Sequence, residues 1–223
     1  IFIAISSFGL NSCGQSKKEN KEGTITSSQE KPFFKLSLAQ WSLHKEIIEG
    51  KMSPLDFAQK AKELGFEGIE YVSQLYTNEL KKNPDSKVAM ETLLTTLKEK
   101  SKIYNIKNVL IMVDNEGDLA SIVEAERNEA VENHKKWVDA AQFLGCHSIR
   151  VNLFGTNDPD VWKQTAADGL SKLASYAKDK NINVIVENHG YLSSNAALLV
   201  EVIRNINAPN CGVLPDFGNF CLN

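Results

Sequence analysis

The stretch NVIVENH at residues 183–189 decides the fold, together with its near repeat CGVLPD at residues 211–216. Successive side chains of a strand point to opposite faces, so Ile185 and Glu187 share one face while the valines between them share the other. One face is therefore suited to packing against helices, and the opposite face ends in a carboxylate. The second stretch repeats this arrangement and ends in Asp216. Both stretches are predicted to be strands of one parallel sheet.

Outward from these two strands, short β-branched or apolar runs alternate with longer amphipathic runs from Phe33 onward. That alternation is typical of βα units around a parallel sheet. Helix ends are marked at Ser53-Pro54, which supplies an N-cap and a first-turn proline, and at Gly145, which ends a helix. Strands are predicted at 36–40, 68–72, 108–113, 148–153, 183–187 and 211–216, and helices at 53–64, 87–104, 124–144, 160–179 and 195–206.

Two α/β folds fit six strands with intervening helices: a doubly wound open sheet and a (β/α)8 TIM barrel. A nucleotide-binding open sheet carries a glycine-rich turn after its first strand, but the turn here reads Trp41-Ser42-Leu43-His44. No GxGxxG or Walker-type sequence occurs in the chain. Polar side chains instead follow several different strands, as they do in barrels. We therefore expect residues 33–223 to form a TIM barrel that is C-terminally truncated to about six βα units.

The first 32 residues are predicted to lie outside the barrel. Residues 1–10 are an apolar stretch too short to span a bilayer as a helix, and the segment that ends in Cys13 resembles the lipobox of bacterial lipoproteins. That resemblance implies a signal-peptide remnant at 1–13, a lipid anchor on Cys13 and an extracytoplasmic location, in the periplasm or at the cell surface. The polar residues 14–32 indicate a flexible tether. The alternative is an apolar tail with an incidental cysteine.

The composition argues against two classes of function. Lys and Arg number 25 against 28 Asp and Glu, for a net charge of −3, whereas binding to phosphate backbones needs clustered positive charge. Four cysteines are too few and too scattered for a disulfide framework, and we expect Cys146, Cys211 and Cys221 to be small buried side chains. We expect a small-molecule partner, no nucleic acid, and membrane contact only through the anchor. A homo-oligomer is left open.

The side chains at the predicted strand ends carry the candidate chemistry. Glu187 and Asp216 end neighbouring strands, and two carboxylates so close repel each other unless a cation lies between them. Oxygen ligands with at most one imidazole favour a divalent metal, Mn²⁺ first, with Mg²⁺, Co²⁺ or Zn²⁺ as alternatives. The strand-end set comprises Gln40, Trp41, His44, Glu70, Asp114, Arg150, Asn152, Glu187, Asn188, His189, Asp216 and Asn219.

Several of these residues also have a purely structural explanation. Glu70 would then be a solvated charge at a strand end, and Arg150 would pair with a neighbouring acid. His44 and His189 would be loop histidines that only form hydrogen bonds. The proximity of His189 to Glu187 along the chain favours its place in the site.

Five strand-end strings together resemble the xylose isomerase-like TIM-barrel superfamily of sugar isomerases and epimerases. The resemblance implies that Glu187 is the metal ligand after strand five and that Asp216 is the ligand after strand six. The family's His near strand seven and Glu after strand eight have no counterpart up to Asn223, and we expect both beyond it. The strings are LSLAQWSLH (36–44), GFEGIEYV (65–72), SIRVN (148–152), VIVENHG (184–190) and VLPDFGNF (213–220).

This resemblance implies a divalent-metal-dependent isomerase or epimerase of a sugar or keto-sugar. A metal at the carbonyl and its neighbouring hydroxyl would stabilise an enediolate, and Glu187 would transfer the proton. His189 and Arg150 would bind substrate oxygens, and Trp41 would supply an apolar wall. The remaining substrate-binding candidates are His44, Glu70, Asn152 and Asn219.

Two other functions stay open. Endonuclease IV-like DNA-repair enzymes share the superfamily, but their zinc cluster needs many histidines and a cationic groove, and this chain has four His. A carbohydrate-binding lipoprotein would use the barrel as a receptor without turnover. The sequence has no phosphate-binding glycine loop, which favours a free sugar, keto-sugar or glycoside over a sugar phosphate.

Overall fold

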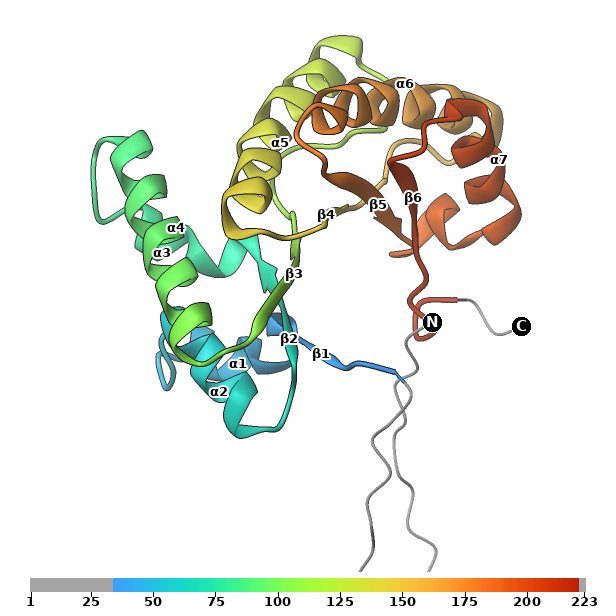
Figure 1. Ribbon diagram of the computed structural model, residues 1–223. Helices are drawn as coiled ribbons and strands as arrows, with labels where there is room; N and C mark the ends of the chain where they lie inside the picture. Colours follow the sequence, from blue (N-terminus) through green and yellow to red (C-terminus); the bar gives the residue numbers. More distant parts are fainter. Residues whose placement is uncertain (1–33, 221–223) are drawn as a thin grey trace, which may run out of the picture. The chain divides into compact units, whose positions relative to one another are not determined.

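The computed structural model describes residues 34–220, and the compact unit within them begins at Ser37 (Figure 1). The segments 1–13 and 14–32, and with them the lipidation candidate Cys13, lie outside the described residues. The anchor, the tether and the extracytoplasmic location therefore stay predictions.

Six parallel strands form one sheet, and they follow one another across the sheet in chain order from β1 to β6. A doubly wound sheet reverses its strand order near the middle, so the consecutive order excludes that fold. The structure confirms a TIM-barrel-type arrangement of six parallel strands, with helices between successive strands. The strands are β1 (Ser37–Ala39), β2 (Gly68–Val72), β3 (Lys107–Met112), β4 (Ser148–Val151), β5 (Asn183–Glu187) and β6 (Cys211–Leu214).

Helices connect the strands, and α4 to α7 cover the outer side of the sheet (Figure 1). None of the helices within residues 34–220 is long and apolar enough to cross a bilayer. The α-helices are α1 (His44–Ile48), α2 (Phe57–Glu63), α3 (Thr77–Leu80), α4 (Ser86–Ile103), α5 (Glu124–Leu144), α6 (Pro159–Lys178) and α7 (Ala196–Ile206). Short 3-10 helices span Gln40–Leu43, Pro54–Asp56, Ser73–Tyr76 and Tyr191–Ser194.

The long helices begin and end where their sequences supply caps. Asp85, Asp158 and Asn195 accept hydrogen bonds from the first backbone N–H groups of α4, α6 and α7. Gly145 ends α5 in the left-handed conformation, at φ 77°, which a residue without Cβ adopts at little cost. Ser53 caps its helix as predicted, although the first turn there is a 3-10 helix.

The sheet separates two apolar clusters. The larger cluster fills the space between the outer face of the sheet and the helices, and it includes Val184 and Val186 of β5. A smaller cluster on the inner face contains Leu110 and Met112 of β3, with Ile185 packed against it. The alternation predicted along β5 is therefore confirmed: valines face the helices, and Ile185 and Glu187 face the interior of the barrel.

The structure differs from the expected elements in a few places. The last strand ends at Leu214 rather than at residue 216, because Pro215 has no N–H to donate to a neighbouring strand. The short helices α1 and α3 were not predicted.

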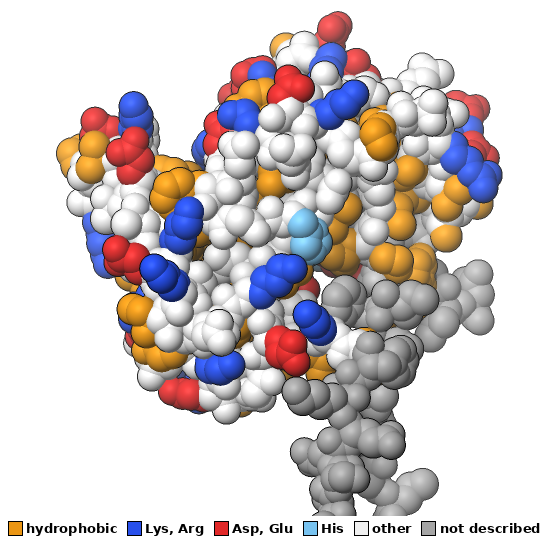
Figure 2. Space-filling view, in the orientation of Figure 1, with side chains coloured by type: hydrophobic (Ala, Val, Ile, Leu, Met, Phe, Trp, Pro, Cys, Tyr) orange, Lys and Arg blue, Asp and Glu red, His pale blue; other side chains and the backbone are white. Residues whose placement is uncertain are grey.

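Charged side chains of both signs are interspersed over the face shown in Figure 2. This distribution agrees with the small net charge of the sequence.

Candidate active site

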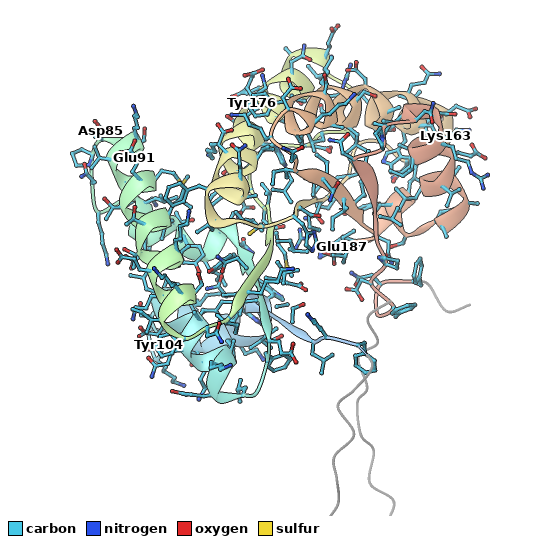
Figure 3. All side chains as sticks on the ribbon, in the orientation of Figure 1. Asp85, Glu91, Tyr104, Lys163, Tyr176 and Glu187 are labelled. Carbon is cyan, nitrogen blue, oxygen red and sulfur yellow. The ribbon has the colours of Figure 1, made fainter. Side chains whose placement is uncertain are left out.

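Polar side chains from four neighbouring strands gather at the carboxyl end of the sheet. Asp114 follows β3, Arg150 lies in β4, Glu187 is the last residue of β5, and Asp216 follows β6. Because all strands are parallel and neighbours in order, their carboxyl ends meet at one edge of the sheet. Figure 3 labels Glu187 at this position.

A buried arginine lies at the centre of this group. Arg150 is only 5% exposed, and its Nη1 donates a hydrogen bond of 2.8 Å to Oδ1 of Asp114. Its Nε lies 2.8 Å from Oε2 of Glu187, an ion pair without good hydrogen-bond alignment. One guanidinium thus pairs with two carboxylates that end different strands. The contacts of Arg150 are therefore those of the purely structural explanation, in which it pairs with neighbouring acids.

Asn152 leaves one polar atom available. Its Nδ2 donates to Oδ1 of Asp114 at 2.8 Å, while its Oδ1 is buried and has no hydrogen-bond partner. A buried acceptor without a partner is costly unless a ligand or water donates to it. This atom is therefore suited to a substrate hydroxyl.

Asn219 connects the two candidate metal ligands. Its Nδ2 lies 3.2 Å from Oε1 of Glu187 and 2.9 Å from Oδ2 of Asp216. The two carboxylates therefore converge on a single donor. Asn188 holds the end of β6 beside β5, because its amide accepts from the backbone N of Asp216 at 2.7 Å and donates to the backbone O of the same residue at 2.9 Å.

Burial shifts the pKa values of two carboxyls of the inner face. Burial raises the pKa of Glu187 above its usual range, and the nearby Asp216 and Asp114 add to this, while Arg150 and His189 oppose it. Burial also raises the pKa of Glu70 in β2, against the lowering effects of the Ser37 hydroxyl, which donates to it, and of Arg150. Each carboxyl is more readily protonated than a solvated one.

The remaining predicted substrate residues form a separate pair or stand apart. The rings of Trp41 and His44 stack at 4.3 Å between centroids with planes 7° apart, and His44 Nδ1 lies 2.5 Å from the backbone O of Trp41. Among the described residues, no hydrogen bond or ion pair joins this pair to Glu187. His189 is exposed and acts on Glu187 through its charge. Gln40 is fully buried and bonds Tyr76 and the backbone of Val72, a structural position.

Sequence reasoning assigned no role to Asp114 or Asn188, although both were among the strand-end side chains. The signal available for Asp114 was its place directly after an apolar strand, in line with Arg150 and Asn152 on the next strand. The place of Asp114 in the site depends on its contacts with Arg150 and Asn152 of the neighbouring strand, and the spacing of residues along one strand does not reveal such contacts.

The carboxylates of Glu187 and Asp216 fit one side of a divalent-cation site. They already share one donor between them, and a cation at that point would relieve their repulsion more fully than an amide does. Within residues 34–220, three or more His, Cys, Asp or Glu side chains do not gather into a complete ligand set. These two residues would therefore supply two ligands, and further oxygen ligands would complete the coordination shell.

The sequence profile of the family described as "Xylose isomerase-like TIM barrel" matches residues 58–223. No curated protein matches the sequence. Among solved structures, the apo form of the 3-keto-D-glucoside 4-epimerase YcjR from E. coli is 16% identical, with a TM-score of 0.60, over 74% of this chain and 63% of that one. A D-psicose 3-epimerase, crystallised with D-fructose, is 18% identical, with a TM-score of 0.61, over 82% and 63%. The IolI protein with a bound zinc atom is also 18% identical, with a TM-score of 0.61, over 81% and 62%.

The chain spans between 62% and 63% of the length of these three proteins. At identities of 16% and 18%, the likeness shows the fold alone. Sugar epimerases are nevertheless among the proteins that share this fold, and one protein of the same fold holds a metal.

Proposed function

Because the chain belongs to the xylose isomerase-like TIM-barrel family, we propose that it is a divalent-metal-dependent isomerase or epimerase of a sugar or keto-sugar. The observation that carries this proposal is that Glu187 and Asp216 converge at the carboxyl end of the sheet, beside the buried guanidinium of Arg150. Sugar epimerases with the same fold support the reaction class.

Glu187 is the proposed base. Its pKa is raised by burial, so it accepts a proton from carbon more readily than a solvated carboxylate does. Arg150 holds one of its oxygens at 2.8 Å and fixes the direction of the carboxylate. After the proton has moved to Glu187, the same guanidinium still pairs with Asp114 and keeps that end of the site neutral.

The cation would supply a single kind of chemistry. Bound to Glu187 and Asp216, it would act as a Lewis acid on the carbonyl of the substrate and so make the neighbouring C–H more acidic. Mn²⁺ suits carboxylate and carbonyl ligands best, with Mg²⁺, Co²⁺ and Zn²⁺ as alternatives.

The other residues of the site would position the sugar. Asn152 has an unpartnered buried Oδ1 that would accept from a hydroxyl, and His189 is exposed close to Glu187. Trp41 and His44 present a stacked pair that would form an apolar wall. Attachment to a membrane through Cys13 is a separate part of the proposal, supported by the sequence alone.

Replacing Glu187 with Gln tests the proposal. The full chain would be incubated in D₂O with Mn²⁺ and a panel of ketoses and keto-glycosides, and NMR would follow the loss of the exchanging C–H signal. The wild type is expected to exchange one position, and Glu187→Gln is expected to lose at least a hundredfold in rate with its fold intact. Glu201→Gln, an exposed Glu on α7 that pairs with Lys163, is the matched control and is expected to keep the wild-type rate.

The exchange experiment, together with an assay on abasic DNA with Zn²⁺, distinguishes the alternatives. A sugar receptor would bind a carbohydrate without exchange of any C–H. An endonuclease IV-like enzyme would cleave abasic DNA in the presence of Zn²⁺ and would leave the sugars unchanged. Exchange that persists in Glu187→Gln would show that another residue is the base.

A further inference from the structure

Two exposed aromatic side chains are in contact with each other, and both follow strands of the sheet that carry the candidate active site. Phe154 follows β4 two residues after Asn152, and Tyr191 follows β5 four residues after Glu187. Their ring centroids are 6.2 Å apart with planes 88° apart, an edge-to-face contact. The side chain of Phe154 is 41% exposed and that of Tyr191 is 71% exposed. Burial in the core therefore does not explain either ring.

The loop that carries Phe154 is fixed in place. The carboxylate of Asp118 accepts hydrogen bonds from the backbone N–H groups of Phe154, Gly155 and Ala120, at 3.2, 2.6 and 2.9 Å. Gly155 has a positive φ of 67°, and a Cβ there would lie 2.7 Å from the backbone O of Ala120. The close approach of two loops thus requires a glycine next to Phe154, and it fixes the backbone that carries the ring.

The loop that carries Tyr191 holds a strained residue. Tyr191 has a φ of 51°, a conformation that residues other than Gly, Asn and Asp rarely adopt. Two serine hydroxyls stabilise the turn before it: Ser193 accepts from the backbone N of His189 at 3.1 Å, and Ser194 accepts from that of Gly190 at 2.9 Å. A bulky ring at such a position costs stability, and strain of this kind gathers at ligand sites.

We propose that Phe154 and Tyr191 form an outer subsite that packs against the C–H face of a second sugar ring, so that the substrate is a glycoside rather than a free monosaccharide. This inference rests on the proposed function and names its substrate class. The strand ends carry the polar groups that would act on the reacting sugar. The two aromatic residues follow these polar groups along the chain. The Cα atom of Tyr191 lies within roughly 14 Å of that of Glu187, because four residues can span no more.

Aromatic rings stack favourably on the C–H faces of sugars because the contact removes apolar surface of both partners from water. Burying about 60 Å² of apolar surface per ring stabilises a complex by about 1.5 kcal/mol, which corresponds to roughly tenfold in affinity. A free monosaccharide bound at Glu187 would gain no such contact with the outer subsite. The ratio of the affinities for a disaccharide and for a monosaccharide therefore measures the contribution of Phe154 and Tyr191.

The test measures binding to the full chain by saturation-transfer NMR and calorimetry, with Mn²⁺ present. The probes are glucose and four of its disaccharides: maltose, cellobiose, trehalose and sucrose. The wild type is expected to bind at least one disaccharide about tenfold or more tightly than glucose. Phe154→Ala and Tyr191→Asn are each expected to lose most of this preference while their affinity for glucose stays the same. Asn tolerates a positive φ, so the second variant removes the ring without new backbone strain.

Phe143→Ala is the matched control, because that ring is 43% exposed but lies near the end of α5, where Lys98 stands 4.4 Å from its centroid. It is expected to keep the wild-type preference. Equal affinity for glucose and all four disaccharides, or a preference that survives in both variants, would overturn the outer subsite and leave the proposed function standing. If no probe binds and no ketose or keto-glycoside exchanges a C–H in D₂O, the proposed function fails instead.

Discussion

At the scale of single residues, Glu70 is a carboxyl on the inner face of β2 whose pKa is raised by burial. The native state then binds a proton more tightly than the unfolded chain does. The free energy of unfolding therefore falls as the pH rises from about 4.5, the unperturbed pKa of a Glu carboxyl, through the folded-state pKa of Glu70. Glu70→Gln removes this titration and keeps an oxygen that accepts from Ser37.

Glu70→Gln is thus expected to be more stable than the wild type at pH 7 and to show a smaller decrease in stability between pH 4.5 and pH 8. Urea unfolding followed by circular dichroism at several pH values measures both effects. Glu67→Gln, at an exposed position just before β2, is the matched control and should change neither. A variant that loses stability at pH 7 would mean that the charge of Glu70 is needed by Arg150.

The cysteines give a second residue-scale result. Burial raises the pKa of the Cys146 thiol to about 12 and that of Cys211 to about 11. Both side chains are buried, as the sequence predicted, and at such pKa values they are protonated near neutral pH. The chemistry of the site therefore lies with its carboxylates.

At the scale of elements, α6 packs unusually close to the loop before α5. A Cβ on Gly169 would lie 2.0 Å from the backbone O of Leu119. In an exposed helix, Gly→Ala stabilises by about 1 kcal/mol, but here overpacking against a backbone atom costs about 1 to 3 kcal/mol or more. After the gain in helix propensity is subtracted, Gly169→Ala is expected to destabilise the protein by up to about 2 kcal/mol.

Chemical denaturation measures this change directly. Ser171→Ala, at an exposed position of the same helix, is the matched control and should gain a few tenths of a kcal/mol from helix propensity. A more stable Gly169→Ala variant would show that α6 can shift away from Leu119 at little cost, and that the close contact does not determine how the helix is placed.

The elements also show which features a sequence reveals. Period-two alternation and caps are local, so β2, β5 and α5 were predicted to the residue. The choice of a TIM barrel over a doubly wound sheet followed from the absence of a glycine-rich first turn and from polar residues after several strands. Residue contacts across strands are not local: the pairing of Arg150 with both Asp114 and Glu187 depends on three strands meeting. The short helices α1 and α3 have too few residues for a period to emerge.

At the scale of the whole molecule, the candidate cation site links ligand binding to the stability of the fold. An ion that binds only the native state stabilises it by about 2.7 kcal/mol at a concentration of a hundred times its Kd. For a protein of this size each kcal/mol raises the melting temperature by roughly 2 to 4 °C, so Mn²⁺ is expected to raise it by about 5 to 10 °C. Differential scanning calorimetry at increasing Mn²⁺ measures the rise.

Variants of the three converging side chains locate the ion. Glu187→Gln and Asp216→Asn each remove a ligand charge and are expected to abolish most of the rise in melting temperature. Asn219→Ala removes only the amide that donates to both carboxylates, at 3.2 and 2.9 Å. With that donor gone the two charges repel more strongly, so this variant should melt lower without metal and yet show an equal or larger rise with Mn²⁺. The same rise in all variants would place the ion elsewhere, and no rise with Mn²⁺, Mg²⁺, Co²⁺ or Zn²⁺ would show that the carboxylates act without a metal.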